Sequence, residues 1–324
     1  MNRKLALRAL LVCIILILVL VVLYSGLQIL ESTVLLQEQS QMQTTSKTIT
    51  RDGVKYYPRQ DITVVLLMGI NQSGPVVQTE YNCGGAVDMV TLMIFDEKTE
   101  TCRLLSLNRD MMVDMPMLNA YGREAGVFNG QLAFAHTYGD GMADSCENVR
   151  KTVSNLLYGV QVDYYFSLNM DAIALLNDAV GGVTVNVVDD FSAVDPSLPM
   201  GEVTLRGQQA VTYVQTRWGV GDQLNLSRME RHKEYMGSFV DALRDKIENQ
   251  SGFAVDAYES VAQYIVTDCS VQILSRLEKD YGDYSLGETY TVEGENVLGE
   301  EYYEFYADEE KLDALILELF YAPK

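Results

Sequence analysis

Three arginines, Arg217, Arg228 and Arg231, fall within fifteen residues of a chain whose formal net charge is −21. Arginine binds phosphate bidentately and keeps its charge at physiological pH. An acidic chain gains no solubility from gathered guanidinium groups, so the cluster indicates a bound anion such as a phosphate. The alternative is that these arginines pair with surface carboxylates.

Two of these arginines lie on one predicted helix. Apolar spacing over residues 225–249 predicts a long amphipathic helix, and Arg228 and Arg231, three residues apart, share a face near its start beside His232. The first turn of a helix attracts anions through its free amide groups and its dipole. Arg217 is predicted to end the preceding helix, so a short loop would bring it close.

Carboxylates accompany the arginines at two predicted strands. Arg109 and Asp110 follow the strand predicted over residues 103–107, and Asp88 begins an apolar run at 88–95. Ligands of α/β sheets bind at the carboxyl ends of strands. Asp88 would repel a phosphate unless a cation stood between them, and Mg²⁺ or Mn²⁺ binds carboxylates and phosphate oxygens together. The spacing alone leaves open whether these segments meet.

The first thirty residues indicate a membrane anchor. Arg3, Lys4 and Arg8 precede an apolar run over residues 9–30, which is about the length of a membrane-crossing helix. The chain beyond is acidic, so the positive-inside bias leaves residues 1–8 in the cytoplasm and the bulk of the chain outside. A cleaved signal peptide is the alternative, although its apolar core is usually shorter and a small-residue cleavage site follows it.

Residues 31–60 are rich in Gln, Ser and Thr and are predicted to be a stalk or linker. Outside the predicted anchor the chain has four of its five cysteines. Cys83 and Cys146 lie in polar stretches, and an extracytoplasmic location would permit a disulfide between them. Free thiols are the alternative. With two histidines and no C-x-x-C spacing, a zinc site is not expected.

Strands alternating with helices over residues 61–250 predict an α/β fold, namely an α-β-α layered domain around a mixed central sheet. The short turn at 96–98 predicts an antiparallel hairpin of strands 88–95 and 103–107. Residues 251–324 are predicted to form a small C-terminal α+β extension, or a cover for the main sheet. Further strands are predicted at 62–68, 162–168 and 183–188, and helices at 129–138, 144–157, 169–180, 208–217, 225–249 and 308–319, the second of them capped by Asp144 or Ser145.

Seven segments over residues 61–248 resemble one known family. They are VVLLMGIN at 64–71, GGAVDMVTLMIFD, SLNRDMMVDM, QLAFAHTYGDG, VDYYFSLNMDAIALLNDAVGGVTVNV, LRGQQAVTYVQTR and GDQLNLSRMERHKEY. In this order, behind a single N-terminal anchor, they are similar to the LytR-CpsA-Psr family of membrane-anchored cell-wall enzymes.

The resemblance implies helices around a mixed sheet and a long apolar pocket for a polyprenyl chain. It also implies a reaction in which a teichoic-acid-like or capsule-like glycopolymer moves from a polyprenyl-pyrophosphate carrier to a hydroxyl of peptidoglycan. Mg²⁺ and guanidinium groups would neutralise the charge on the phosphoryl oxygens. The resemblance assigns catalysis to Asp88, Arg109 and Asp110, pyrophosphate binding to Arg109, Arg217, Arg228, Arg231 and His232, and metal binding to Asp88 and, weakly, Asn71.

The chain departs from the family pattern at several of these positions. Asn71 and Gln215 replace an aspartate and an arginine, and Ala86 replaces another arginine. Val127 and Phe128 stand where a lysine is expected, and His232 replaces a glutamine. Arg123, Arg150 and Lys151 are candidates for replacement charge.

Three functions remain compatible with these residues. A working glycopolymer transferase is favoured, because Asp88 and most of the arginines are retained. A non-catalytic protein that binds polyprenyl-linked glycan or regulates the cell wall is the main alternative, and a pyrophosphate hydrolase is a weaker one. Nucleic-acid binding is not expected from an extracytoplasmic chain with a net charge of −21.

Overall fold

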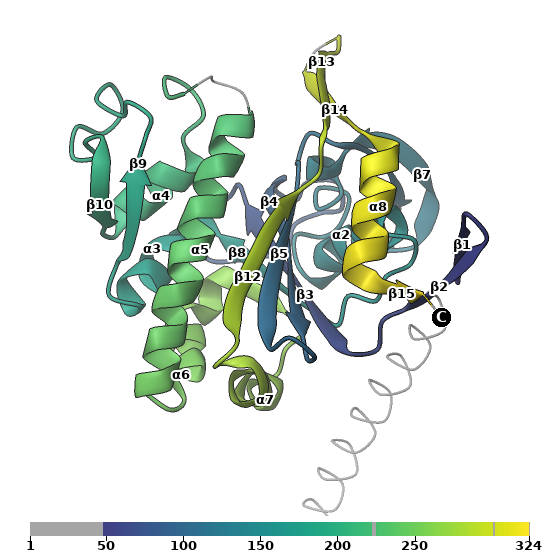
Figure 1. Cartoon of the computed structure of the whole chain (residues 1–324). Coiled ribbons are helices and arrows are strands. Elements are labelled where there is room, and N and C mark those ends of the chain that lie inside the picture. Colours follow the sequence, from purple (N-terminus) through teal and green to yellow (C-terminus); the bar gives the residue numbers. More distant parts are fainter. Residues whose placement is uncertain (1–47, 222–224, 301, 324) are drawn as a thin grey trace, which may run out of the picture. The chain divides into compact units, whose positions relative to one another are not determined.

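The computed structural model describes residues 48–221, 225–300 and 302–323. Their centre is a six-stranded mixed sheet of order β11-β8-β3-β4-β5-β12 (Figure 1). β3 is antiparallel to β4 and parallel to β8, and β4 and β5 form the predicted antiparallel hairpin. The strands are β3 (Ile62–Ile70), β4 (Val87–Asp96), β5 (Thr101–Leu107), β8 (Tyr164–Asn169), β11 (Ile265–Thr267) and β12 (Ser285–Thr291).

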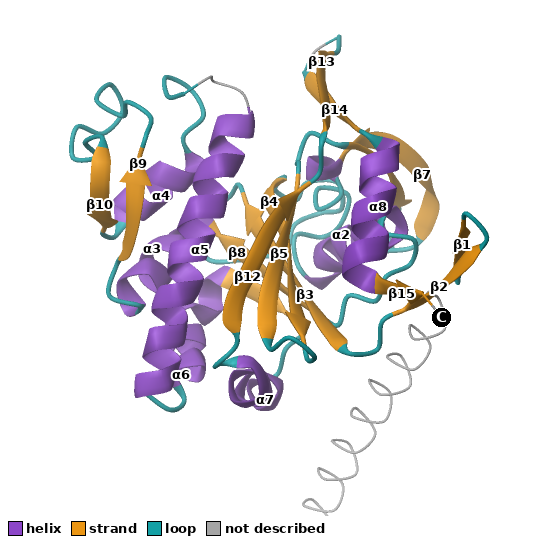
Figure 2. Ribbon diagram, viewed as in Figure 1, coloured by secondary structure: helices purple, strands orange, loops and turns teal. Residues whose placement is uncertain are grey.

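The apolar runs of the central strands are explained by burial on both faces of the sheet, since helices lie on each side (Figure 2). Val64, Leu66 and Met68 of β3 enter a core with α2 (Ala143–Leu156) and α8 (Glu309–Phe320). Leu67 points the other way, as strand alternation requires, toward α3 (Met170–Ala179), α5 (Asn225–Asn249) and α6 (Phe253–Val261). The predicted α-β-α layering around a mixed sheet is confirmed.

A second core lies on the α5 side. The hairpin of β9 (Val183–Val187) and β10 (Gly201–Leu205) packs with α4 (Gln208–Gln215) and α5 around buried Tyr213 and Phe191. This core fixes the start of α5 beside the end of the sheet where β4 begins.

The C-terminal part of the chain is woven into the same sheet. β11 pairs with β8 at one edge, and β12 pairs with β5 at the other. α7 (Val271–Tyr281) connects them, with the 3-10 turn η2 (Ala262–Tyr264) just before β11. The stretch predicted as a stalk is described from residue 48 onward, where β1 (Ile49–Arg51) and β2 (Val54–Pro58) form a small sheet with β15 (Tyr321–Pro323).

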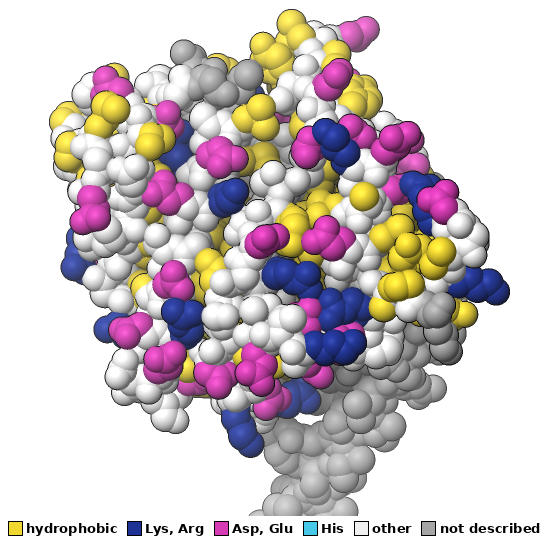
Figure 3. Space-filling view, in the orientation of Figure 1, with side chains coloured by type: hydrophobic (Ala, Val, Ile, Leu, Met, Phe, Trp, Pro, Cys, Tyr) yellow, Lys and Arg dark blue, Asp and Glu magenta, His cyan; other side chains and the backbone are white. Residues whose placement is uncertain are grey.

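Two further hairpins were not predicted. β6 (Met112–Leu118) pairs with β7 (Glu124–Gln131), and β13 (Gly294–Leu298) pairs with β14 (Tyr303–Ala307). Apolar side chains gather at the tip of the second hairpin, while Lys and Arg are interspersed with Asp and Glu over the rest of that face (Figure 3). Exposed Leu298 and Tyr306 belong to this hairpin.

The helix predicted over residues 129–138 is wrong. That stretch begins as the end of β7 and continues into the 3-10 turn η1 (Leu132–Phe134). The amide groups of Leu132 and Ala133 donate to the carbonyl oxygens of Met111 and Arg109, 2.8 Å away in both cases, so the backbone is used across the chain and not along a helix.

Two other boundaries differ from prediction. α2 has Met142 as its N-cap residue, without a side-chain cap, whereas Asp144 or Ser145 had been expected. The Ser145 hydroxyl instead accepts from the Gly141 amide. α4 ends at Gln215, so Arg217 lies in the loop beyond the helix.

Of the two alternatives left open for Cys83 and Cys146, the structure has the free thiols. Cys83 is exposed, and Cys146 is fully buried on α2. The predicted anchor at residues 9–30 and the tail at 1–8 lie outside the described residues. Within the part of the chain that the structure describes, no helix combines the length and apolar character needed to cross a membrane.

Candidate active site at the start of β4

Asp88 occupies a bulge at the start of β4. Gly69 of β3 pairs with Met89, and the next residue, Ile70, pairs with Val87, so Asp88 stands between them without a strand partner. A bulge commonly redirects a side chain at the edge of a sheet. A Cβ added at Gly69 would lie 3.2 Å from the Met89 Cβ, so glycine allows the two strands their close approach here. Asp88 is buried, with 8% of its surface exposed.

Two predicted arginines meet on this carboxylate. Arg109 Nη1 donates to Asp88 Oδ1, and Arg228 Nη1 donates to Asp88 Oδ2 at 3.2 Å. Arg109 also donates through Nε to Asp110 Oδ1 at 3.2 Å. Segments that are 21 and 140 residues from Asp88 in sequence therefore converge, which their spacing alone could not establish.

Two asparagines that the sequence did not single out hold Arg228 in place. Asn225 Oδ1 accepts from Arg228 Nη2 at 2.7 Å, and Asn225 Nδ2 donates to Asn108 Oδ1 at 2.8 Å. Asn108 Oδ1 also accepts from the Asp110 amide at 2.9 Å. Buried polar groups require such partners. The start of α5 is thereby joined to the loop after β5.

The arginines of the site are buried and repel one another. Burial, with Arg109 and Arg217 nearby, lowers the pKa of Arg228 to about 10. Burial is also the largest cause that lowers the pKa of Arg109, with a further contribution from Arg217. Arg217, half-buried in its loop, is thus close enough to act on both. A bound anion would relieve this repulsion between like charges.

Arg231, which was predicted to bind pyrophosphate, donates hydrogen bonds to other groups of the protein. Its Nε donates to the Tyr213 carbonyl at 3.0 Å, its Nη1 to Asp189 at 2.6 Å, and its Nη2 to the Thr216 carbonyl. The guanidinium also lies 5.5 Å from the ring centre of Phe191. These contacts anchor the loop after α4.

His232 lines the site as an uncharged side chain. Its Nε2 lies 2.8 Å from the Val214 carbonyl oxygen, so this nitrogen must carry the proton. Burial, followed by the charge of Arg228, lowers the pKa of His232 to about 3. At neutral pH the imidazole therefore adds no positive charge for a phosphate.

The remaining departures fall at diverse places. Asn71 is exposed just after β3, and its amide donates to the Ala86 carbonyl at 3.0 Å. Gln215 lines the pocket described below, whereas Val127 is 70% exposed on β7. Two of the three candidate replacement charges have other partners: Arg150 pairs with Glu147 and Asp268, and Lys151 pairs with Glu124.

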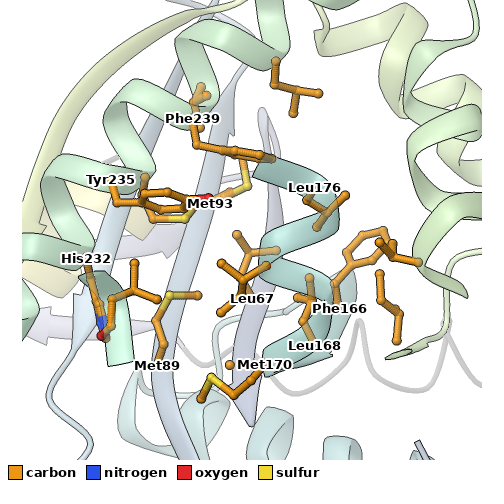
Figure 4. A pocket seen from close by; sticks show the side chains of 18 of the residues that line it. Leu67, Met89, Met93, Phe166, Leu168, Met170, Leu176, His232, Tyr235 and Phe239 are labelled. Atoms are coloured by element: carbon orange, nitrogen blue, oxygen red, sulfur yellow. The ribbon is translucent and has the colours of Figure 1, made fainter. Parts of the chain in front are cut away.

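An apolar pocket opens beside the Asp88–Arg228 pair. It has a volume of about 260 Å³ and lies between one face of the sheet and helices α3, α5 and α6 (Figure 4). Asp88, Arg228, His232 and Gln215 contribute to its lining, and the rest is almost entirely aliphatic or aromatic. The labelled apolar side chains are Leu67, Met89, Met93, Phe166, Leu168, Met170, Leu176, Tyr235 and Phe239.

The family of this chain can be identified from its sequence. The LytR_cpsA_psr family profile matches residues 24–319. The chain belongs to the LytR-CpsA-Psr family. Among its curated relatives is the polyisoprenyl-teichoic acid–peptidoglycan teichoic acid transferase TagU of Bacillus subtilis, 25% identical over 84% of this chain and 82% of the relative.

Another LytR-CpsA-Psr relative, TagU of Oceanobacillus iheyensis, is 28% identical over 50% of this chain and 45% of its own length. The chain spans about half the length of the first curated relatives it matches. Solved structures of TagT, one from Bacillus subtilis and one bound to LI-WTA, give TM-scores of 0.60 and 0.62 at 23% identity, covering 85% of this chain and 95% of theirs. At this identity the likeness concerns the fold.

The residues of this LytR-CpsA-Psr site fit a divalent cation only together with the phosphates of a ligand. Across residues 48–221, 225–300 and 302–323, no group of three His, Cys, Asp or Glu side chains could enclose a metal. Asp88 is a single carboxylate in the pocket lining, and Asn71 is an exposed neutral residue just after β3, the strand that pairs with β4. Mg²⁺ binds in sites of this kind when a ligand's phosphates complete its coordination.

Proposed function

We propose that this protein is a phosphotransferase that attaches a polyprenyl-pyrophosphate-linked glycopolymer, of teichoic-acid or capsule type, to peptidoglycan. One observation carries the proposal, namely that Asp88 and Arg228 line the same pocket as a continuous apolar surface. A molecule that fills both parts must have an anionic group attached to a long hydrocarbon. The names of the relatives support the same chemistry.

The arginines account for the anionic part. Arg109 and Arg228 converge on Asp88, and the charge of Arg217 acts on both. A pyrophosphate placed among them would accept charge-assisted hydrogen bonds, which are shorter and stronger than neutral ones. Because the guanidinium groups are held in advance by Asp88, Asp110 and Asn225, little reorganisation is needed at the moment of reaction.

The apolar pocket accounts for the hydrocarbon part. Each buried methylene contributes about 0.8 kcal/mol, so an isoprenoid segment would bind firmly through this surface alone. Phe166, Phe239 and Leu243 are among the side chains that would contact the isoprenoid.

We propose the following transfer step at these groups. The oxygen of an acceptor hydroxyl attacks the glycopolymer-side phosphorus, and the bond from that phosphorus to the bridging oxygen breaks. The electron pair leaves with polyprenyl phosphate, and a new phosphodiester joins the polymer to the acceptor. We assign Asp88 to receive the hydroxyl proton, Arg109 and Arg228 to stabilise the phosphoryl oxygens, and Asp110 to orient Arg109.

We propose Mg²⁺, or Mn²⁺, as the cofactor of this site. Asp88 would hold the ion together with the substrate phosphates, and Asn71 would contribute at most a weak neutral ligand. The ion would neutralise charge that develops on the phosphoryl oxygens.

We also propose that the protein acts outside the cytoplasm. The basic residues before the apolar run at 9–30 support a single-pass anchor with its N-terminus inside. This location would give the described domain access to both a lipid carrier and peptidoglycan.

A non-catalytic binding protein is the second candidate, and one observation favours it. Both oxygens of Asp88 accept hydrogen bonds from arginines, so the carboxylate must exchange a partner before it can take a proton or a cation. Such a protein would bind the lipid-linked glycan without turnover.

One experiment separates these functions. The full chain, in detergent, is mixed with a polyprenyl-pyrophosphate-linked oligosaccharide, Mg²⁺ and a peptidoglycan fragment. The transferase forms the phosphodiester product and releases polyprenyl phosphate in equal amount. Binding of the substrate without any product would exclude the transferase, and cleavage that ignores the acceptor would indicate a hydrolase.

A further inference from the structure

The only tryptophan of the chain lies next to the arginine site, with 72% of its surface exposed. Trp218 follows Arg217 directly in the loop between α4 and α5. A large exposed aromatic ring offers much rigid contact area at low cost in conformational entropy, which is why such rings recur in binding surfaces. A single exposed apolar residue is by itself unremarkable, so its setting decides what it means.

The loop that carries Trp218 is fixed on both sides. Before it, the Thr216 carbonyl accepts from Arg231, which also donates to the Tyr213 carbonyl and to Asp189. After it, Val220 is only 2% exposed and packs into that same core. The indole is therefore held out toward solvent between two buried anchors.

The ring is also tied to the arginine cluster. The Arg217 guanidinium carbon lies 5.4 Å from the Trp218 ring centre, within the range of a cation–π contact. Arg217 in turn acts electrostatically on Arg109 and Arg228, which contact Asp88. Arg217 thus contacts Trp218 and lies close enough to Arg228 of the pocket lining to act on its charge.

We propose that Trp218 forms a sugar-binding subsite, on which the sugar ring attached to the substrate's pyrophosphate stacks. The inference rests on the proposed function, since a lipid-linked glycan has its groups in the order hydrocarbon, pyrophosphate, sugar. One face of a pyranose ring consists of C–H groups, which pack on the flat face of an indole, while its hydroxyls stay in water. Trp218 would thereby select for a carrier that bears a sugar.

The hydrocarbon has another place to bind, which favours a sugar as the occupant of Trp218. The pocket beside Asp88 is lined by side chains of the sheet and of α3, α5 and α6, and Trp218 does not contribute to it. A bilayer surface is the other partner that an exposed tryptophan can meet. The contact with Arg217, which belongs to the arginine cluster, favours a ligand of the site over a membrane.

Tryptophan fluorescence tests the proposal, because Trp218 is the sole source of that signal. The full chain in detergent is titrated with farnesyl pyrophosphate, and separately with farnesyl pyrophosphate bearing one N-acetylhexosamine. The sugar-bearing probe is expected to shift the emission to shorter wavelength, and farnesyl pyrophosphate is not. An equal response to both probes, or a response to sugar-free lipid vesicles alone, would overturn the subsite.

Substitution gives a second, independent readout by calorimetry. Trp218→Ala is expected to weaken binding of the sugar-bearing probe by roughly 3- to 10-fold and Trp218→Phe by less, on the scale of an aromatic contact. Affinity for farnesyl pyrophosphate should stay within about twofold. Tyr121→Ala removes another highly exposed aromatic, on the β6–β7 hairpin, and serves as the matched control.

The outcome also separates this inference from the proposed function. If farnesyl pyrophosphate binds and phosphodiester forms while Trp218→Ala leaves the affinity for both probes unchanged, the subsite is wrong and the transferase stands. If neither probe binds the unmodified protein, the proposed function fails, and the inference fails with it.

Discussion

Asn225 Nδ2 lies 2.8 Å from Asn108 Oδ1, and this contact joins the first residue of α5 to the loop that carries Arg109. The opposite end of the Asn225 amide accepts two hydrogen bonds from Arg228, at 2.7 and 3.2 Å. One side chain thus sets the separation of two arginines that reach Asp88 from different elements.

The first prediction concerns this bridge. Asn225→Ala removes both contacts and leaves Arg228 with fewer partners, and a hydrogen bond to a charged group is worth about 1.5–3 kcal/mol. We expect transfer to fall at least tenfold in kcat, with a smaller change in the substrate concentration at half-maximal rate. Steady-state kinetics of phosphodiester formation measure both values. Unchanged kcat in a folded Asn225→Ala protein would contradict a positioning role.

Asp88 is the subject of the second prediction. Asp88→Asn keeps the shape of the side chain but removes the proton acceptor. It also removes the negative charge that pairs with both Arg109 and Arg228, so transfer should fall by roughly 10²–10³-fold. Binding of the lipid pyrophosphate should be kept or strengthened, since a negative charge has been removed beside it. Asp114→Asn, at an exposed position of β6, is the control. Full transfer in Asp88→Asn would rule out the assigned base.

The third prediction adds a carboxylate. Asn71→Asp would place a second acidic group just after β3, the strand that pairs with the Asp88-bearing β4, and Mg²⁺ commonly uses one or two carboxylates. The Mg²⁺ concentration for half-maximal transfer should fall about tenfold, in line with one added charge-assisted ligand. Chelation by EDTA should stop transfer in the unmodified protein while lipid binding persists.

The control for this change is Asn155→Asp, which adds the same charge at an exposed position of α2. If both variants shift the Mg²⁺ dependence equally, the effect is one of net charge. Transfer that continues in EDTA would exclude the metal.

Pocket volume gives the fourth prediction. Ala254 of α6 lines the pocket, and Ala254→Phe would fill space that an isoprenoid needs. Displacing one five-carbon unit removes several methylene-sized contacts of about 0.8 kcal/mol each, so long polyprenyl carriers should bind at least tenfold more weakly. A two-unit carrier should be affected far less. Leu175→Phe, at an exposed position of α3 outside the lining, is the control, and equal loss for all chain lengths would contradict the pocket's role.

Much of the fold could be predicted from sequence because its signals are local. The apolar runs of β3 and β4, the short turn before β5 and the amphipathic period of α5 each indicate one element, and all four elements are found. The helix expected at 129–138 failed because Leu132 and Ala133 give their amide groups to a distant loop, a long-range pairing that no periodicity reports. The β6–β7 hairpin is local, but Pro116 in β6 and the glycines Gly126 and Gly130 in β7 weaken the strand signal of both segments.

The candidate site, too, was predicted only in part from the sequence. Residue type and family order suggested Asp88, Arg109 and Arg228, and the structure brings these three together. The bridge through Asn108 was not predicted, since an asparagine after a strand carries no signal of its partner. Arg231 shares the helix face of Arg228, yet each of its three nitrogens donates to a group outside α5, namely Tyr213, Asp189 and Thr216.

The fifth prediction is a dependence of stability on pH through His232. Its pKa is lowered in the folded protein to about 3, mainly by burial, and is about 6.5 in the unfolded chain. Well above pH 6.5 the imidazole is neutral in both states. As the pH falls below 6.5, the unfolded chain binds a proton that the folded protein does not, so stability is lost progressively toward pH 3.

Integrated from pH 7 to pH 5, this loss amounts to at most about 2 kcal/mol for one group. His232→Gln retains a donor for the Val214 carbonyl but cannot titrate, so its free energy of unfolding should fall less steeply with pH than that of the unmodified protein. Denaturant unfolding at pH 7 and pH 5 measures the difference. His136, the other histidine, is buried as well and remains in both proteins, so its contribution cancels. Parallel pH curves would show that His232 binds its proton as readily in the folded protein as in the unfolded chain. That result would contradict the assignment of His232 as an uncharged residue of the pocket.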